Sequence, residues 1–99
     1  MNVLEEIKEI LKKYKEDIVR EYKIKEIGIF GSYVRGEQKK RSDIDILVEF
    51  NEDDIPDLLR FIEMERYLKR LLRRKVDLVR KEGIRPELKA IVLKEVIYL

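Results

Sequence analysis

The sequence predicts an α/β (α+β) fold, in which a small mixed β-sheet of at least three strands carries helices packed on one face. Three observations lead to this prediction. The chain has 99 residues, a length that suits one modest hydrophobic core, so residues 1–99 are predicted to form a single domain. Segments with the spacing of amphipathic helices alternate with short apolar segments typical of strands. Helices on one face would leave the other face of the sheet free for a ligand.

The first part of the chain predicts a helix and then a strand that ends in a glycine turn. The helix is expected over about Val3–Glu21, because apolar residues recur there at steps of three and four: Leu4, Ile7, Leu11, Tyr14 and Ile18. Ile24–Phe30 follows as a short strand that runs directly into Gly31. Ser32 is a good helix N-cap, so Tyr33–Arg35 is expected to form one helical turn, which Gly36 ends.

The clearest alternation of apolar and polar residues lies in Asp43–Phe50, after the polar loop Glu37–Arg41. One face of this segment is apolar and the other carries most of its acids; the two sets are Ile44, Ile46 and Val48 against Asp43, Asp45, Leu47 and Glu49. Side chains alternate across a strand with a period of two. The pattern therefore predicts a strand with one buried face and one face available for function.

The second half of the chain predicts a helix, a strand and a final helix. Asn51–Pro56 is expected to turn, and Asp57–Arg73 is expected to be helical, with an apolar stripe that Glu65 interrupts: Leu58, Phe61, Ile62, Leu68, Leu71 and Leu72. Lys75–Val79 is the third predicted strand. Gly83 and Pro86 bracket the start of a last helix that reaches about Lys94, since proline suits the first helical turn.

Composition excludes several classes of function. Although charged residues make up 44% of the chain, 23 basic and 21 acidic residues leave a net charge of only +2. A dedicated nucleic-acid binder needs a clearer basic surplus, so direct binding of nucleic acid is not expected. The chain has no cysteine and no histidine. Disulfides, zinc sites built from these residues and histidine catalysis are thereby excluded, and a metal would need oxygen ligands.

Targeting signals are not evident. The sequence has no apolar run close to the roughly 18 residues that a membrane span needs. Met1–Lys12 is too charged for a secretory signal peptide. The protein is therefore expected to be cytoplasmic.

Candidate chemistry lies in Gly31-Ser32, which is followed after ten residues by Asp43-Ile44-Asp45. On a strand, Asp43 and Asp45 point the same way, about 7 Å apart at their Cα atoms. Paired carboxylates are costly without a cation between them, and Asp77 adds a third acid on a later strand. A hard cation such as Mg²⁺ relieves this repulsion, and a triphosphate held at the Gly-Ser turn would bring one. The pattern indicates nucleotidyl transfer.

The expected mechanism is in-line attack by a hydroxyl on a bound nucleoside triphosphate. Backbone N–H groups of Gly31 and Ser32 would hold the outer phosphates, because glycine permits close approach. One Mg²⁺ would bind Asp43 and Asp45, and a second would share these ligands with Asp77, which could assist as general base. The cations of the intervening loop are candidates for neutralising phosphate charge: Arg35, Lys39, Lys40 and Arg41.

Three segments together make the chain resemble the minimal nucleotidyltransferases (MNT) of the polymerase-beta-like superfamily. They are Gly31–Glu37, Ser42–Val48 and Lys75–Val79. The chain is most similar to the antitoxins that are paired with HEPN-type ribonuclease toxins. This resemblance implies the nucleotidyltransferase fold, ATP as nucleotide, two Mg²⁺ ions and transfer of AMP to a hydroxyl group of the toxin, that of a tyrosine.

The same resemblance carries residue roles to matching positions. It implies that Asp43, Asp45 and Asp77 are the catalytic residues and magnesium ligands, and that Gly31 and Ser32 contact the phosphates. Arg35 and Ser42 are taken as further nucleotide or phosphate contacts. It also implies a hetero-oligomer of this chain with its cognate toxin.

Two other functions remain open at the level of sequence. The chain could be an antitoxin that blocks its partner by contact alone, or a nucleotidyltransferase that modifies a small molecule. The basic run Lys69–Lys75 is either a partner or RNA surface or the solvated end of a helix, where cations are favoured.

Overall fold

One four-stranded mixed sheet organises the protein, whose residues 2–99 are described by a computed structural model. The strands are β1 (Ile24–Phe30), β2 (Ile44–Phe50), β3 (Val76–Arg80) and β4 (Ile97–Tyr98), in the order β3-β2-β1-β4. β1 pairs antiparallel with β2 and β4, whereas β2 and β3 are parallel. The predicted mixed sheet is therefore confirmed. The two-residue β4 was not predicted, because so short a strand produces no alternation.

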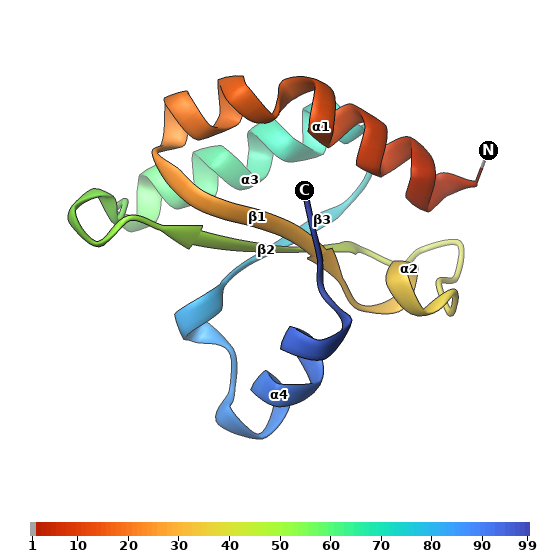
Figure 1. The fold of residues 1–99 in the computed structure, drawn as a ribbon. Helices are drawn as coiled ribbons and strands as arrows, with labels where there is room; N and C mark the ends of the chain where they lie inside the picture. Colours follow the sequence, from red (N-terminus) through yellow and green to blue (C-terminus); the bar gives the residue numbers. More distant parts are fainter. Residues whose placement is uncertain (1) are drawn as a thin grey trace.

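Helices lie on both faces of the sheet (Figure 1). The long helices α1 (Val3–Tyr22) and α3 (Leu58–Leu72) cover one face, as predicted. The short α2 (Ser32–Arg35) follows β1, and α4 (Pro86–Glu95) lies across the opposite face, where a free surface was expected. The reason is topological. β3 and β4 are opposite edges of the sheet, so the chain between them must cross it, and α1 and α3 already fill the other face.

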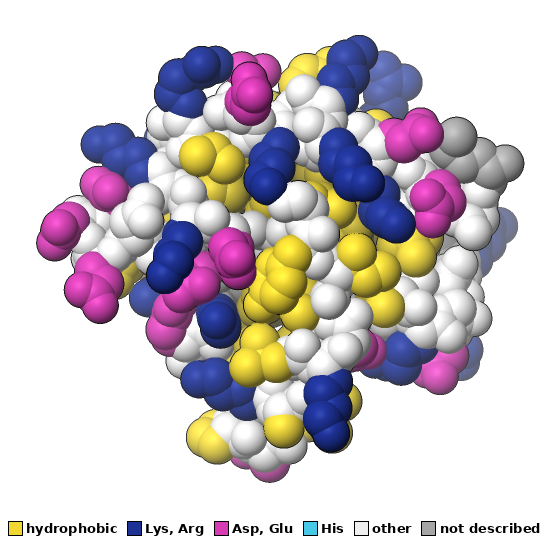
Figure 2. Space-filling view, viewed as in Figure 1, with side chains coloured by type: hydrophobic (Ala, Val, Ile, Leu, Met, Phe, Trp, Pro, Cys, Tyr) yellow, Lys and Arg dark blue, Asp and Glu magenta, His cyan; other side chains and the backbone are white. Residues whose placement is uncertain are grey.

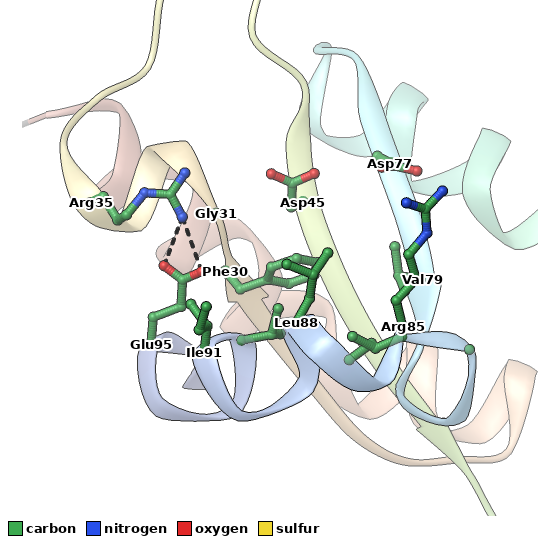
Figure 3. A pocket seen from close by; sticks show the side chains of 13 residues that line it. Phe30, Gly31, Arg35, Asp45, Asp77, Val79, Arg85, Leu88, Ile91 and Glu95 are labelled. Carbon is green, nitrogen blue, oxygen red and sulfur yellow. Dashed lines mark hydrogen bonds and ion pairs between the residues drawn. The ribbon is translucent and has the colours of Figure 1, made fainter.

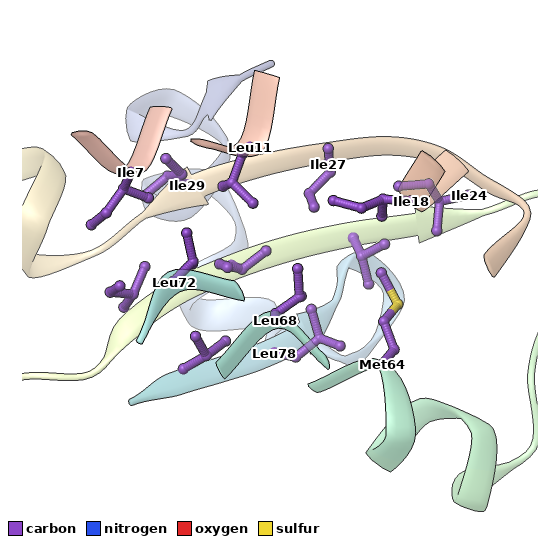
Figure 4. Packing of buried hydrophobic residues seen from close by; sticks show 14 of the residues in the cluster. Ile7, Leu11, Ile18, Ile24, Ile27, Ile29, Met64, Leu68, Leu72 and Leu78 are labelled. Carbon is purple, nitrogen blue, oxygen red and sulfur yellow. The ribbon is translucent and has the colours of Figure 1, made fainter. Parts of the chain in front are cut away.

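The hydrophobic core lies between the sheet and the two long helices (Figure 4). The strands contribute their apolar face, and the helices contribute one stripe each: Ile27, Ile29, Ile44, Ile46, Val48, Val76 and Leu78 from the strands, with Ile7, Leu11, Ile18, Met64, Leu68 and Leu72 from the helices. Because side chains alternate along a strand, Asp45 and Asp77 face away from this core. Packing of the core face thereby determines where the acids point.

The predicted apolar stripe of α3 is partly wrong. Leu58 is 72% exposed and Ile62 is 36% exposed, whereas Met64, absent from the predicted stripe, is fully buried. The helix is rotated so that residues 61, 64, 68 and 72 face the sheet, a spacing of three and four that fits one helical face. Leu58 is therefore left on the surface at the start of the helix.

Glu65 interrupts the α3 stripe because it protects a strand edge. β3 is the edge of the sheet, so backbone N–H groups on its outer side have no neighbouring strand. The Leu78 N–H donates to Glu65 Oε2 at 3.0 Å, and Lys69 lies 3.5 Å from the other carboxylate oxygen. A half-buried acid on this helix thus satisfies a backbone donor that sheet pairing leaves free.

Replacement of Glu65 by alanine is expected to destabilise the protein. The Glu65→Ala variant leaves the Leu78 N–H without its acceptor, at a cost of about 1–3 kcal/mol in the free energy of unfolding. Urea unfolding followed by circular dichroism measures this loss. Glu65→Gln keeps an acceptor oxygen and should lose less; equal losses for the two variants would contradict this role.

The surface carries charges of both signs. Figure 2 shows basic and acidic side chains interspersed over one face of the molecule, with hydrophobic side chains along its centre. Across residues 2–99, none of the helices combines the length and the apolar character that crossing a membrane requires.

Candidate active site

Asp45 and Asp77 lie side by side on adjacent strands. They are register partners in the parallel pair β2–β3, so both side chains leave the sheet on the face opposite the core. Asp45 is half-buried and Asp77 is exposed. Asp43 lies just before β2 begins and is exposed. The structure therefore brings two of the three predicted acids together on one surface and places the third beside the start of the strand.

Gly31 lies directly against the Asp45 carboxylate. Its backbone has φ +83° and ψ −154°, a conformation that essentially only glycine adopts. A Cβ atom built on Gly31 would collide with the carboxylate, with Asp45 Cγ only 2.9 Å away. Both the turn and the space at this position therefore require glycine.

Ser32 does not cap the short helix as predicted. Gly31 is the cap residue of α2 and Ser32 is its first helical residue, without a side-chain cap hydrogen bond. The Gly31 carbonyl oxygen accepts from the N–H groups of Val34 and Arg35 at 3.0 and 3.2 Å. The unusual conformation of Gly31 positions its carbonyl for these bonds, so the turn forms without help from a hydroxyl group.

A cavity of about 480 Å³ opens between the acidic face of the sheet and α4 (Figure 3). Asp45, Asp77 and Gly31 line it on the side of the sheet. The facing wall belongs to α4 and is partly apolar, with Leu88 and Ile91 46% and 58% exposed. The cavity combines charged groups on one side with an apolar wall on the other, as expected for a site that binds an organic ligand.

Arg35 reaches the cavity but is already paired. Its guanidinium donates to both carboxylate oxygens of Glu95 at 3.0 and 2.9 Å, and to Glu37 at 3.0 Å (Figure 3). The contacts with Glu95, both made by Arg35 Nη1, join α2 to the end of α4. A phosphate at this position would compete with Glu95 for Arg35. Glu95 was not predicted as a site residue, because helical periodicity carries no information about a partner sixty positions away.

Arg85 is a second cation of the cavity that sequence analysis missed. It precedes α4, and Figure 3 shows its guanidinium directed toward Asp77. In the sequence it is one of 23 basic residues. Only the path of the chain across the sheet brings it opposite the acids.

Ser42 and the loop cations Lys39, Lys40 and Arg41 lie outside this cavity. The Ser42 hydroxyl accepts from the Lys39 N–H at 2.8 Å, and the Ser42 N–H donates to the Lys39 carbonyl at 3.1 Å. Ser42 instead lines a separate hollow of about 320 Å³, together with Lys40 and Arg41. In this arrangement its hydroxyl closes the loop that precedes β2.

The pKa of the Asp45 carboxyl is raised from 3.8 to about 6. Burial is the largest cause, followed by the negative charges of Asp77 and Asp43, while Arg35 opposes the shift. The negative charge of the Asp45 carboxylate is therefore not fully neutralised by the surrounding protein. Oxygen donors with excess negative charge fit a divalent cation, although among residues 2–99 no three acidic side chains are close enough to hold a metal ion as they stand.

Asp45 is expected to make the metal-free protein less stable as the pH rises. Its carboxyl has a higher pKa in the folded state, about 6, than the ordinary value of 3.8 that it has in the unfolded chain. Its contribution to stability is therefore complete below about pH 4 and is lost as the pH rises through 6. In calorimetry with EDTA, the Tm of the natural chain should fall relative to that of Asp45→Asn between about pH 4 and 6.5. A constant difference over this range would contradict the shift.

Comparison with known proteins places the chain among nucleotidyl-transferring proteins. Residues 5–99 match the family model described as "Nucleotidyltransferase domain". The chain is 50% identical over 99 residues to the protein adenylyltransferase MntA of Thermococcus cleftensis, covering 100% of this chain and 98% of that protein.

Two solved structures are similar in fold. A toxin–antitoxin crystal structure with AMP-PNP matches with a TM-score of 0.70 and 30% identity, over 87% of this chain and 69% of the other. A mutant of the toxin–antitoxin MntA–HpeT matches with a TM-score of 0.66 and 26% identity, over 99% of this chain and 71% of the other.

Proposed function

The chain belongs to the nucleotidyltransferase domain family, and on that premise we propose that it is an antitoxin that transfers AMP from ATP to a hydroxyl group of a partner toxin. The observation that carries this proposal is the pairing of Asp45 and Asp77, which lie in register on adjacent strands. Gly31 lies in close contact with the Asp45 carboxylate. The names of the chain's relatives support the proposal: one is a protein adenylyltransferase, and similar folds occur in toxin–antitoxin structures.

The residues of the cavity have distinct roles in this reaction. Gly31 allows the backbone to approach the outer phosphates, since it has no side chain. The first turn of α2, including Ser32, offers backbone N–H groups to them, and Arg35 offers a guanidinium once Glu95 releases it. When bound, Mg²⁺ would supply positive charge to the triphosphate and to the attacking hydroxyl, and we propose that two ions are held by Asp43, Asp45 and Asp77.

The transfer is a substitution at the α-phosphorus of ATP. The acceptor oxygen forms a bond to this phosphorus while the bond to the oxygen that bridges the α- and β-phosphates breaks, and pyrophosphate leaves. Asp77 is exposed on the open side of the cavity, where a carboxylate can take the hydroxyl proton. From the family resemblance, we propose a tyrosine of a HEPN-type ribonuclease toxin as the acceptor.

The test uses the protein encoded by the adjacent reading frame as acceptor. With Mg²⁺ and ATP labelled at the α-phosphate, label should appear on the acceptor, and mass spectrometry should find AMP on a tyrosine. The Asp43→Ala/Asp45→Ala double variant should transfer none. If this variant still neutralises the toxin in cells, contact alone explains the antitoxin effect and the proposal fails.

A further inference from the structure

A cluster of basic side chains, separate from the cavity, surrounds the hollow beside Ser42. It consists of Lys40 and Arg41 from the loop before β2, and of Arg73, Arg74 and Lys75 from the turn between α3 and β3; we call these five residues the basic hollow. The two segments are distant in the sequence. Folding brings them together because β2 and β3 are parallel neighbours and both begin at this end of the sheet.

The basic hollow is poorly neutralised by the protein itself. Of its five cations only Arg74 has an acidic partner, Glu6 at 3.7 Å, among the ion pairs formed by residues 2–99. Among the other cations of residues 2–99, eight of 18 pair with an acid, and Arg35 and Arg60 pair with two each. Like charges collected without counterions repel one another. An arrangement of this kind is relieved when an anionic ligand binds.

The basic hollow lies close to the candidate active site along β2 and β3. The Ile44 N–H donates to the Lys75 carbonyl at 2.9 Å, which joins the starts of the two strands. Asp45 follows Ile44 and Asp77 lies two residues beyond Lys75, so the acids are about 7 Å along the strands from the hollow. A chain that presents a hydroxyl group to the cavity would therefore lie close to these cations.

We propose that the basic hollow binds acidic residues that flank the acceptor hydroxyl of the partner protein, and so selects the segment to be modified. This inference rests on the proposed function, since it assumes a protein acceptor. A carboxylate-rich peptide fits for two reasons. The hollow is small, about 320 Å³, and confined to two short segments. The chain as a whole has a net charge of only +2, which does not favour a nucleic acid that needs cations along an extended track.

Charge complementarity of this kind affects mainly the rate at which two proteins associate and the choice of partner. Charged groups at the edge of an interface raise association rates and disfavour partners of the same charge. Salt weakens both effects. The basic hollow should therefore lower the KM for an acidic acceptor without changing the chemical step. Acceptor segments with lysine or arginine beside the hydroxyl group should have a higher KM.

The test measures peptide binding, so that it does not depend on activity. The probe is a fluorescent twelve-residue peptide with one tyrosine and four flanking glutamates; a second peptide has glutamines in their place. The triple variant Lys40→Gln/Arg41→Gln/Lys75→Gln removes three cations and leaves Arg73, whose φ is +54°, and the ion-paired Arg74 unchanged. The matched control Lys12→Gln/Lys13→Gln/Arg66→Gln removes three exposed cations from the outer faces of α1 and α3.

Fluorescence anisotropy at low salt should show the glutamate peptide binding at least tenfold more tightly than the glutamine peptide. The triple variant should lose this preference, whereas the control variant should keep it. Because Lys40, Arg41 and Lys75 line the hollow and not the cavity proposed to hold the nucleotide, ATP titration of both variants should match that of the natural chain. A charge-reversed variant, Lys40→Glu/Arg41→Glu/Lys75→Glu, leaves only Arg73 and the ion-paired Arg74 as cations of the hollow, so it should prefer a peptide with flanking lysines.

Other outcomes would overturn the inference. Equal binding of the two peptides by the natural chain would remove the acidic specificity. Tighter binding of a twelve-nucleotide RNA, lost in the triple variant, would assign the hollow to nucleic acid. A tenfold loss of ATP affinity in the triple variant would assign it to the nucleotide. Failure of AMP transfer in the natural chain, with peptide specificity intact, would instead count against the proposed function.

Discussion

Substitution of Asp45 by asparagine should abolish AMP transfer while leaving the protein at least as stable as before. Asparagine has nearly the same shape as aspartate and keeps the contact with Gly31, so the cavity should remain intact. It cannot supply the negative charge on which a bound cation depends. We expect the rate of transfer to fall about a hundred- to a thousandfold or more, by analogy with the loss of one electrostatic group from other active sites.

Stability should change in the opposite direction from activity. Burial, and then the negative charges of Asp77 and Asp43, raise the pKa of Asp45 to about 6. At pH 7.5 and without metal, removing the charge relieves repulsion, so Asp45→Asn should unfold at an equal or higher temperature. This contrast separates a residue that serves the reaction from one that serves the fold.

Glu49→Gln is the matched control for this experiment. Glu49 lies on the same strand and the same face, four residues along, and pairs with Lys81 at 3.6 Å outside the cavity. Its loss should leave transfer nearly unchanged. Labelled transfer assays and calorimetry on both variants give the comparison. Comparable losses of activity in the two would mean that Asp45 has no special role.

Replacement of Gly31 by alanine should damage both folding and activity. The backbone strain of a side chain at this φ and ψ costs about 1–3 kcal/mol. The new Cβ would also collide with the Asp45 carboxylate, which must then move. We expect a loss of unfolding free energy above the strain alone, and transfer reduced to background because Asp45 and the phosphate turn are both displaced.

Gly36 provides an internal control for the backbone strain. Its φ is +71°, but a Cβ there would meet no atom within 4 Å. Gly36→Ala should therefore cost only the strain and leave transfer largely intact. Urea unfolding of both alanine variants measures the difference, which contains the collision at Gly31 and the greater backbone strain of its φ and ψ. If Gly31→Ala were no more destabilising than Gly36→Ala, the close contact with Asp45 would be wrong.

A double-mutant cycle separates the collision from other effects. In an Asp45→Ala background the Oδ and Cγ atoms are gone, so Gly31→Ala should cost less than in the natural chain. The interaction free energy from the cycle isolates this contact. Additive losses would show that Gly31 and Asp45 act independently.

Local sequence patterns predicted the strands and the direction of their side chains. Alternation and turn residues gave the strand Ile24–Phe30 with the bounds that the structure has. The direction of the Asp45 and Asp77 side chains, away from the core, also followed from local patterns, because core packing of Ile44, Ile46 and Leu78 turns the acids outward. That the two acids are neighbours depends on the parallel pairing of β2 with β3, which no local pattern determines.

Features that depend on distant parts of the chain were not predictable in this way. The rotation of α3 that buries Met64 and exposes Leu58 depends on where the helix meets the sheet. The position of α4 depends on which edges β3 and β4 occupy, and the Arg35–Glu95 pair depends on α4 in turn. Periodicity describes the faces of an element and carries no information about what lies opposite them.

The position of α4 has a consequence for local motion. Across the described residues 2–99, the main hydrophobic cluster includes side chains of α1, α2 and α3 but none of α4. This helix can consequently detach while the cluster stays intact, at a free energy below that of global unfolding. Its amide protons should exchange with deuterium faster than those of α1 and α3, and ATP that draws Arg35 away from Glu95 should alter their exchange first. Protection equal to that of α1 would contradict such independent opening.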